Sequence, residues 1–203
     1  MLGLGKDSFV NILGIDPGSA LTGLGLVCRN GSEVKLVAGH CLRAPTNVPF
    51  EQRLFYLHES LHTFLRNHRV DEVAIEAPFY GANVKTLMQM CQARGSLLTA
   101  VARHEIPVSE YVPREIKKAV VGNGNASKEQ VAFMVKQTLS VGQVDDAWPL
   151  DVTDAIATAL CRAFRAGSLG EQVTPASGKT LEDRLVAAGA PPEVARRVGS
   201  RSR

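Results

Sequence analysis

The chain has 203 residues, of which 45% are hydrophobic and 21% are charged, a composition typical of a globular protein with one sizeable core. No apolar run approaches the roughly 20 residues needed to span a bilayer, and the first residues show neither a signal-type apolar region nor a transit pattern. We therefore expect a cytoplasmic protein without a membrane partner.

The net charge of +3 is unevenly distributed. Residues 162–203 hold eight Lys and Arg against four Asp and Glu, so the preceding 161 residues sum to −1. Within that body, residues 114–136 carry five basic and two acidic residues, a weak indication of phosphate contact. The four cysteines show no CxxC or Cys/His spacing. We expect them to be reduced and buried, without a zinc site or a disulfide framework.

Three strands are predicted first, because apolar and alternating runs are separated by turn residues such as Asn30-Gly31. Helices and two further strands then alternate. The predicted strands cover residues 12–15, 24–28, 33–40, 71–76 and 106–111, and the predicted helices cover residues 54–65, 84–101, 113–120, 131–139 and 151–163. This order predicts an α/β domain with a mixed five-stranded sheet, three antiparallel strands followed by α/β units, flanked by helices.

The second helix is expected to bury a stripe that includes Val84, Met88 and Cys91. Beyond residue 167 the chain becomes rich in Gly, Ser and Thr, which indicates a linker. We expect residues 1–167 to form one domain and residues 168–203 to form a basic, flexible extension with one or two weak helices, broken at Pro191-Pro192.

Four acidic residues interrupt or flank apolar sequence. Asp16 and Glu76 each end an apolar strand, and Asp151 and Asp154 open the last core helix on one face, since residues i and i+3 are neighbours. Each has a simpler explanation: Asp16 could cap its own turn, Glu76 could be a solvated strand end, and the helical pair could cap the helix. If the first and fourth strands are neighbours, four carboxylates converge at one sheet end, where protonation, pKa shifts or cations must relieve their repulsion. Hard cations such as Mg²⁺ or Mn²⁺ are the natural partners of carboxylate oxygens, and a pair of them suits phosphodiester hydrolysis.

Five stretches carry a family resemblance. They are Ile15-Asp16-Pro17-Gly18, Ala74-Ile75-Glu76, Gln92-Ala93-Arg94-Gly95, the run from Tyr111 to Val131, and Asp151-Val152-Thr153-Asp154-Ala155. In this order they resemble the bacterial RuvC family of Holliday-junction resolvases, which belongs to the ribonuclease H-like superfamily. The resemblance implies a ribonuclease H-like fold and a structure-selective endonuclease of homologous recombination and DNA repair. It also implies paired nicks in strands of like polarity at a four-way DNA junction.

The resemblance further implies a homodimer in which each subunit holds two Mg²⁺ ions, with Mn²⁺ as an alternative. By motif position the catalytic and metal-binding residues would be Asp16, Glu76, Asp151 and Asp154. Coupling to the RuvA–RuvB branch-migration complex is implied by the resemblance alone. A two-fold protein suits a two-fold junction, which supports the homodimer on physical grounds.

Three lysines surround a glycine loop at residues 122–126. Lys117, Lys118 and Lys128 match the family pattern and are expected to bind DNA, and the glycines would let backbone N–H groups approach a phosphate. The alternative is that these lysines are solvated helix residues beside a turn.

An aromatic pair follows Glu76 on a Pro-bounded loop. The resemblance implies that Phe79 or Tyr80 stacks on bases at the junction centre, although either could instead pack in the core. Many relatives have Gln or Glu directly after the strand-end acid, whereas Ala77-Pro78 follows here, which puts the geometry of this loop in question. Arg94 could contact DNA or form a structural ion pair.

Two rival functions remain open from the sequence. An actin-like kinase or ATPase also begins with a strand-end Asp-x-Gly hairpin, but that fold usually needs a second similar domain, for which 203 residues leave no room. A junction-binding protein without catalysis is the other alternative, and four intact acids argue against it.

Overall fold

The computed structural model describes residues 9–78, 83–139, 148–169 and 180–199. The elements along the chain are β1 (Val10–Asp16), β2 (Leu21–Asn30), β3 (Glu33–Arg43), α1 (Phe50–Asn67), β4 (Glu72–Glu76), α2 (Val84–Arg103), β5 (Val108–Tyr111), α3 (Pro113–Val121), α4 (Lys128–Thr138), α5 (Leu150–Leu169), α6 (Leu181–Ala187) and α7 (Pro192–Gly199).

The five strands form one mixed sheet in the order β3-β2-β1-β4-β5. β1 pairs with β2 in antiparallel fashion and β2 pairs with β3 in the same way, whereas β4 is parallel to both β1 and β5. The predicted α/β class and mixed sheet are confirmed. β1 lies at the centre because its apolar residues are buried on both faces, which only an interior strand requires.

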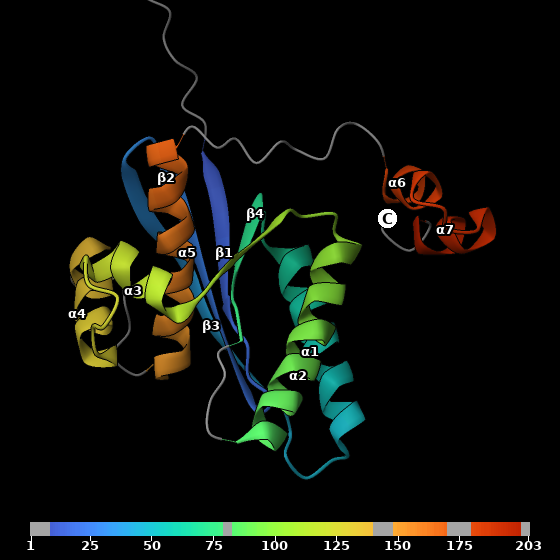
Figure 1. Ribbon diagram of the computed structural model, residues 1–203, viewed down its shortest axis with the longest axis horizontal. Helices are drawn as coiled ribbons and strands as arrows, with labels where there is room; N and C mark the ends of the chain where they lie inside the picture. The colour runs from blue at the N-terminus through green and yellow to red at the C-terminus, as the bar shows by residue number, and fades with distance from the viewer. Residues whose placement is uncertain (1–8, 79–82, 140–147, 170–179, 200–203) are drawn as a thin grey trace, which may run out of the picture.

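Helices cover both faces of the sheet (Figure 1). One face carries α1 and α2, which bury leucines such as Leu57, Leu61 and Leu97 against β1, β2 and β4. The other face carries α5, with α3 and α4 packed beside it, and its core includes Ile156 and Leu160. Side chains alternate between the two cores along each strand, since successive strand residues point to opposite faces.

The predicted buried stripe of α2 is wrong in the first half of the helix. Val84, Met88 and Cys91 are exposed, and the helix buries Ala93, Leu97, Ala100 and Val101 instead. The physical reason is that only the second half of α2 packs on the sheet. All four cysteines are free, but the expectation that they are all buried is wrong: Cys161 is buried, Cys28 and Cys41 are half-buried, and Cys91 is exposed on the outer face of α2.

Two short helices follow the core, α6 and α7, on either side of the predicted break. They pack on each other around the buried Ala195. Glu105, at the end of α2, holds α6 to the body: its carboxylate accepts a hydrogen bond from the Leu181 backbone N–H at 3.2 Å and pairs with Arg184 at 2.9 Å. Among the described helices, none has both the length and the apolar character needed to cross a membrane.

Candidate active site

Strand geometry brings two acids to one face of the sheet. Ile12, Gly14 and Asp16 alternate onto the face covered by α5, as do Ala74 and Glu76 on β4. The parallel register pairs Ile15 with Ile75, which places Asp16 beside Glu76 at the ends of adjacent strands. The convergence that the sequence suggested therefore follows from two neighbouring strands with the same parity.

Glycines in the strands bring α5 close to these acids. A Cβ added to Gly23 would collide with the backbone at Asp151, and one added to Gly14 would collide with the backbone of α5 one turn further on. A Cβ added to a third glycine, Gly25, would collide with the backbone and side chain of Ile156 on α5. Because a glycine inside a strand permits such close backbone contact, the first turns of α5 lie directly over the end of β1.

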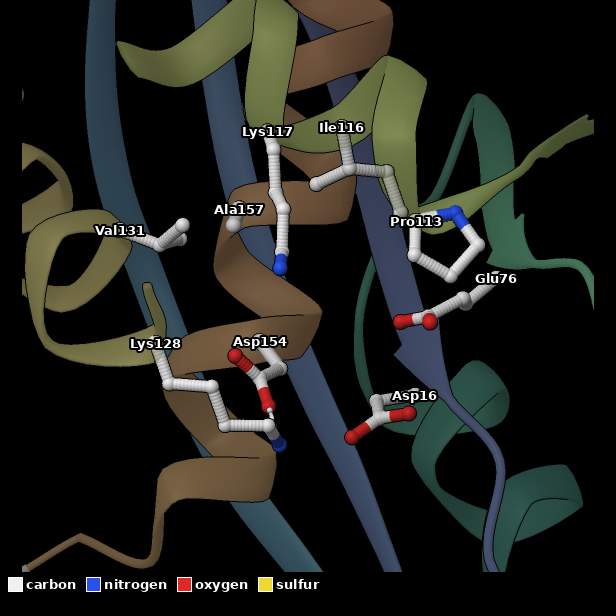
Figure 2. Close-up of a pocket in the computed structure, with 9 residues that line it drawn as sticks. All are labelled: Asp16, Glu76, Pro113, Ile116, Lys117, Lys128, Val131, Asp154 and Ala157. Atoms are coloured by element: carbon white, nitrogen blue, oxygen red, sulfur yellow. Dashed lines mark hydrogen bonds and ion pairs between the residues drawn. The ribbon is translucent and has the colours of Figure 1, made fainter. Parts of the chain in front are cut away.

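Asp16, Glu76 and Asp154 line one open pocket of about 260 Å³, which we call the acid pocket. Lys117 from α3 and Lys128 from the start of α4 line it as well, and Figure 2 shows both lysines reaching into the space that the three carboxylates face. The fourth predicted acid, Asp151, does not line this pocket, although its charge acts on Asp16.

Burial and mutual repulsion perturb the two strand-end acids. Burial first, and then the charges of Glu76, Asp154 and Asp151, raise the pKa of Asp16 to about 8, against the lowering effect of Lys128. Burial likewise raises the pKa of Glu76 to about 7, with Asp154 as the next cause. Carboxyls that hold protons near neutral pH mark a site with too little positive charge for its acids.

Lys128 supplies part of that positive charge. Its Nζ donates a hydrogen bond of 2.7 Å to Asp154 Oδ2, and this bond raises the pKa of Lys128 above its usual value. The Lys128 side chain is 63% exposed, whereas that of Asp154 is 18% exposed, so the ammonium group can also meet a ligand that enters from solvent.

The donor set suits a hard divalent cation, because carboxylate oxygens are the ligands that Mg²⁺ and Mn²⁺ prefer. Three of them share one pocket, and a bound cation would lower the raised pKa values of Asp16 and Glu76 again. As placed among the described residues, no group of three or more His, Cys, Asp or Glu side chains is arranged so that it could hold a metal ion. The donor chemistry therefore fits, while the carboxylates are not closed around one point.

Comparison with known proteins decides the family. The sequence model of the family described as "Crossover junction endodeoxyribonuclease RuvC" matches residues 12–162. A protein of that description from Aliarcobacter butzleri is 41% identical over 77% of this chain and 99% of its own length. Another from Alkalilimnicola ehrlichii is 43% identical over 76% of this chain and 92% of its own length. The chain belongs to the RuvC family.

Solved structures agree with this assignment. A Thermus thermophilus RuvC in complex with a Holliday junction substrate is 32% identical, with a TM-score of 0.72, over 78% of this chain and 96% of that one. The yeast mitochondrial Holliday junction resolvase Ydc2 is 11% identical with a TM-score of 0.59, which shows a shared fold. The predicted ribonuclease H-like, RuvC-type fold is thus confirmed, and the actin-like alternative is set aside.

The other predicted DNA-binding residues of this RuvC-family chain lie in different places. Lys118 is on the far side of α3 from the acid pocket, in a second groove. Arg94 lines a smaller pocket of about 140 Å³ on the other side of Asp16 and Glu76, and its Nη2 lies 2.7 Å from Glu110 Oε1. The predicted structural ion pair of Arg94 therefore exists, and a DNA contact from the same side chain stays a prediction. The aromatic pair at positions 79 and 80 lies outside the described residues.

Sequence reasoning missed three features that build this RuvC-family site. The first is the set of strand glycines that admit α5, whose only sequence signal is their place inside apolar strands. The second is Thr22, whose buried hydroxyl donates to the Gly18 carbonyl at 2.9 Å and closes the turn after Asp16. The third is Arg162, 2% exposed on α5, whose Nε donates to Glu72 Oε2 at 2.7 Å and joins α5 to the start of β4.

Proposed function

We propose that this chain is a structure-selective endonuclease that resolves four-way (Holliday) DNA junctions by paired nicks in strands of like polarity, in homologous recombination and DNA repair. Membership in the RuvC family supports this activity, and so does the similarity to a structure that contains a Holliday junction substrate. The single observation that carries it is the acid pocket, in which three carboxylates from β1, β4 and α5 meet beside two lysines.

Catalysis is proposed to be metal-dependent. Asp16, Glu76 and Asp154 would hold the metal, and Asp151 would support it from the first turn of α5; all four are proposed catalytic and metal-binding residues. Mg²⁺, with two ions per subunit, is the proposed metal, and Mn²⁺ is the alternative. When bound, such ions activate a water molecule and stabilise the leaving oxygen of the phosphodiester.

The protein's own groups prepare the pocket for a phosphodiester. Lys117 and Lys128 place ammonium groups where the scissile phosphate would lie, and ammonium groups bind phosphate oxygens as compact charges. The raised pKa values of Asp16 and Glu76 mean that these carboxyls hold protons near neutral pH. They would release those protons when a cation binds between them. Among the described residues, the acid pocket is open to solvent, so a phosphodiester backbone can reach its carboxylates.

Further DNA contacts are proposed for Lys118, Arg94 and one aromatic residue of the pair Phe79 and Tyr80. Arg94 supports this role by its position, since its pocket shares the side chains of Asp16 and Glu76 with the acid pocket. A strand that crosses these two carboxylates would therefore meet lysines on one side and Arg94 on the other. We propose that the aromatic residue stacks on bases at the junction centre.

We propose that the protein acts as a homodimer, because two nicks related by a two-fold axis require two copies of the site. The exposed stripe of Val84, Met88 and Cys91 on α2 offers an apolar contact surface for a second copy. Sedimentation velocity tests this: Met88→Glu should convert dimers to monomers, and Val186→Glu on α6 should not. Dimers that persist in Met88→Glu would exclude this surface.

Three broader statements also stay proposals. Residues 1–167 are proposed to form the nuclease domain and residues 168–203 a basic extension, flexible apart from the contact between Glu105 and α6. The proposed location is cytoplasmic. Coupling to the RuvA–RuvB branch-migration complex is proposed from family membership alone.

A nicking assay tests the proposed activity. The full chain is incubated with a labelled four-way junction and with a linear duplex of the same sequence, in Mg²⁺, in Mn²⁺ and in EDTA. We expect nicks at symmetric positions in two strands of the junction, dependence on divalent metal, and little cleavage of the duplex. Binding to the junction without nicking in either metal would favour the non-catalytic alternative instead.

A further inference from the structure

Helix α3 divides the basic residues of this region between two faces. Its residues at positions i and i+4 share a face, so Pro113 and Lys117 point to the acid pocket. Arg114 and Lys118, one position later in each case, point to a second groove on the opposite side of the helix. The basic stretch that reads as a single feature in the sequence is therefore two separate surfaces.

The second groove, which we call the basic groove, has a volume of about 710 Å³ and lies between α3, the glycine loop and the C-terminal half of α5. Three cations line it, Arg114, Lys118 and Arg165, against one acid, Glu115. Glu115 forms an ion pair with Arg165, whose Nη2 lies 3.0 Å from Glu115 Oε1. The lining therefore carries a surplus of positive charge.

Arg114 and Lys118 supply that surplus. Both residues are exposed, and within the described part of the chain neither forms a hydrogen bond or an ion pair with its side chain. Arg165, by contrast, is held in place by Glu115 and by the ring of Tyr111, whose centroid is 5.3 Å from the guanidinium carbon. Two exposed cations without partners among the described residues, beside a third that is fixed, are available to pair with an anionic ligand.

The glycine loop gives this groove its shape. Gly122 ends α3 in a left-handed conformation, with φ of 81°, and its N–H donates to the Lys118 carbonyl at 2.9 Å. A Cβ at Gly124 would lie 2.6 Å from Arg114 Cγ, so only a glycine lets the loop lie against the Arg114 side chain. The glycine loop therefore packs against the Arg114 side chain and forms one wall of the groove.

We infer that the basic groove binds the sugar–phosphate backbone of a junction arm, at phosphates other than the one that is cut. The inference rests on the proposed function and adds a second contact site to it. A helix with its side chains is about 10–12 Å across, and successive phosphates of one strand advance about 3.4 Å along the duplex axis. A duplex whose axis crosses α3 from the acid pocket therefore presents to the groove a phosphate about three nucleotides from the cut.

Salt dependence of binding tests this contact. Junction affinity of the full chain is measured in EDTA, which prevents nicking, over a series of salt concentrations for wild type, Arg114→Ala, Lys118→Ala and the double variant. The slope of log K against log salt should fall in magnitude by about 0.9 for each lost phosphate contact, with a roughly ten-fold loss of affinity for each at low salt. Lys35→Ala, on an exposed ion pair with Glu33 in β3, is the matched control and should leave the slope unchanged.

Neutral phosphate analogues locate the contact. Single methylphosphonates are placed along the cleaved strand, and each is combined with the double variant in a thermodynamic cycle. A neutral linkage about three nucleotides from the cut should lower the junction affinity of wild type roughly ten-fold. The same linkage should leave the affinity of the double variant unchanged. Slopes equal to that of Lys35→Ala, or additive losses at every linkage, would overturn the inference. Failure of wild type itself to bind the junction would contradict the proposed function, and the groove inference with it.

Discussion

The raised pKa of Asp16 makes the free energy of unfolding fall as the pH rises, and one substitution removes this contribution. Its pKa rises from 3.8 to about 8, and one unit corresponds to about 1.4 kcal/mol, so ionising Asp16 in the folded protein costs at most about 6 kcal/mol. Water entry and side-chain movement relieve part of this cost, and we expect about 2–4 kcal/mol. Asp16→Asn removes the ionisation altogether.

The sign follows from proton binding. Between about pH 4 and pH 8 the folded protein holds the Asp16 proton more tightly than the unfolded chain does, so its free energy of unfolding falls as the pH rises through this window. Asp16→Asn cannot lose a proton there. We therefore expect the variant to match wild type near pH 4 and to exceed it by about 2–4 kcal/mol at about pH 9.

Urea denaturation without divalent ions, at about pH 4, 6.5 and 9, measures this difference. Glu33→Gln, at an exposed site in the hairpin between β2 and β3, is the control and should stay within about 0.5 kcal/mol of wild type at every pH. A stability difference between Asp16→Asn and wild type that is the same at all three pH values would refute the reasoning about the acid pocket.

Three further outcomes are expected. Arg162→Met should lower the free energy of unfolding in urea by about 2–4 kcal/mol, because it leaves the half-buried Glu72 without its partner. Adding Glu72→Leu should recover part of the loss, and an equal cost in the double variant would contradict this. Gly23→Ala should push the first turn of α5 away from the sheet, because its Cβ would collide with the backbone of Asp151, and should lower nicking more than junction binding. Gly95→Ala is its control: the added Cβ meets nothing within 4 Å and should stabilise α2 by about 0.5–1 kcal/mol. Mg²⁺ affinity measured by calorimetry should rise between about pH 6 and pH 9 with release of protons, and an affinity that does not change with pH would argue against metal in the acid pocket.

The sequence was sufficient for the order of elements, because each strand and helix has its own apolar period. It was also sufficient to single out Asp16 and Glu76, since an acid at the end of a buried strand is costly without a partner. Their meeting depends on the parallel pairing of β1 with β4, which the sequence left open and the structure shows.

The remaining features depend on three-dimensional packing that no local pattern encodes. The stripe of Val84, Met88 and Cys91 has helical periodicity whether it faces the sheet or solvent, and it faces solvent. Adjacent lysines on α3 point to different grooves, which follows from helix geometry only once the position of the helix on α5 is known. The strand glycines carry no side-chain signal, although they determine how closely α5 approaches Asp16.

The most direct test of the central claim is a paired measurement on Asp16→Asn in Mg²⁺. The acid pocket is expected to cut DNA, while the lysines and the basic groove bind it. Asp16→Asn should therefore bind a four-way junction with an affinity within a few-fold of wild type and produce no nicks above background. Nicking by Asp16→Asn at a rate near that of wild type would contradict the assignment of the acid pocket as the active site.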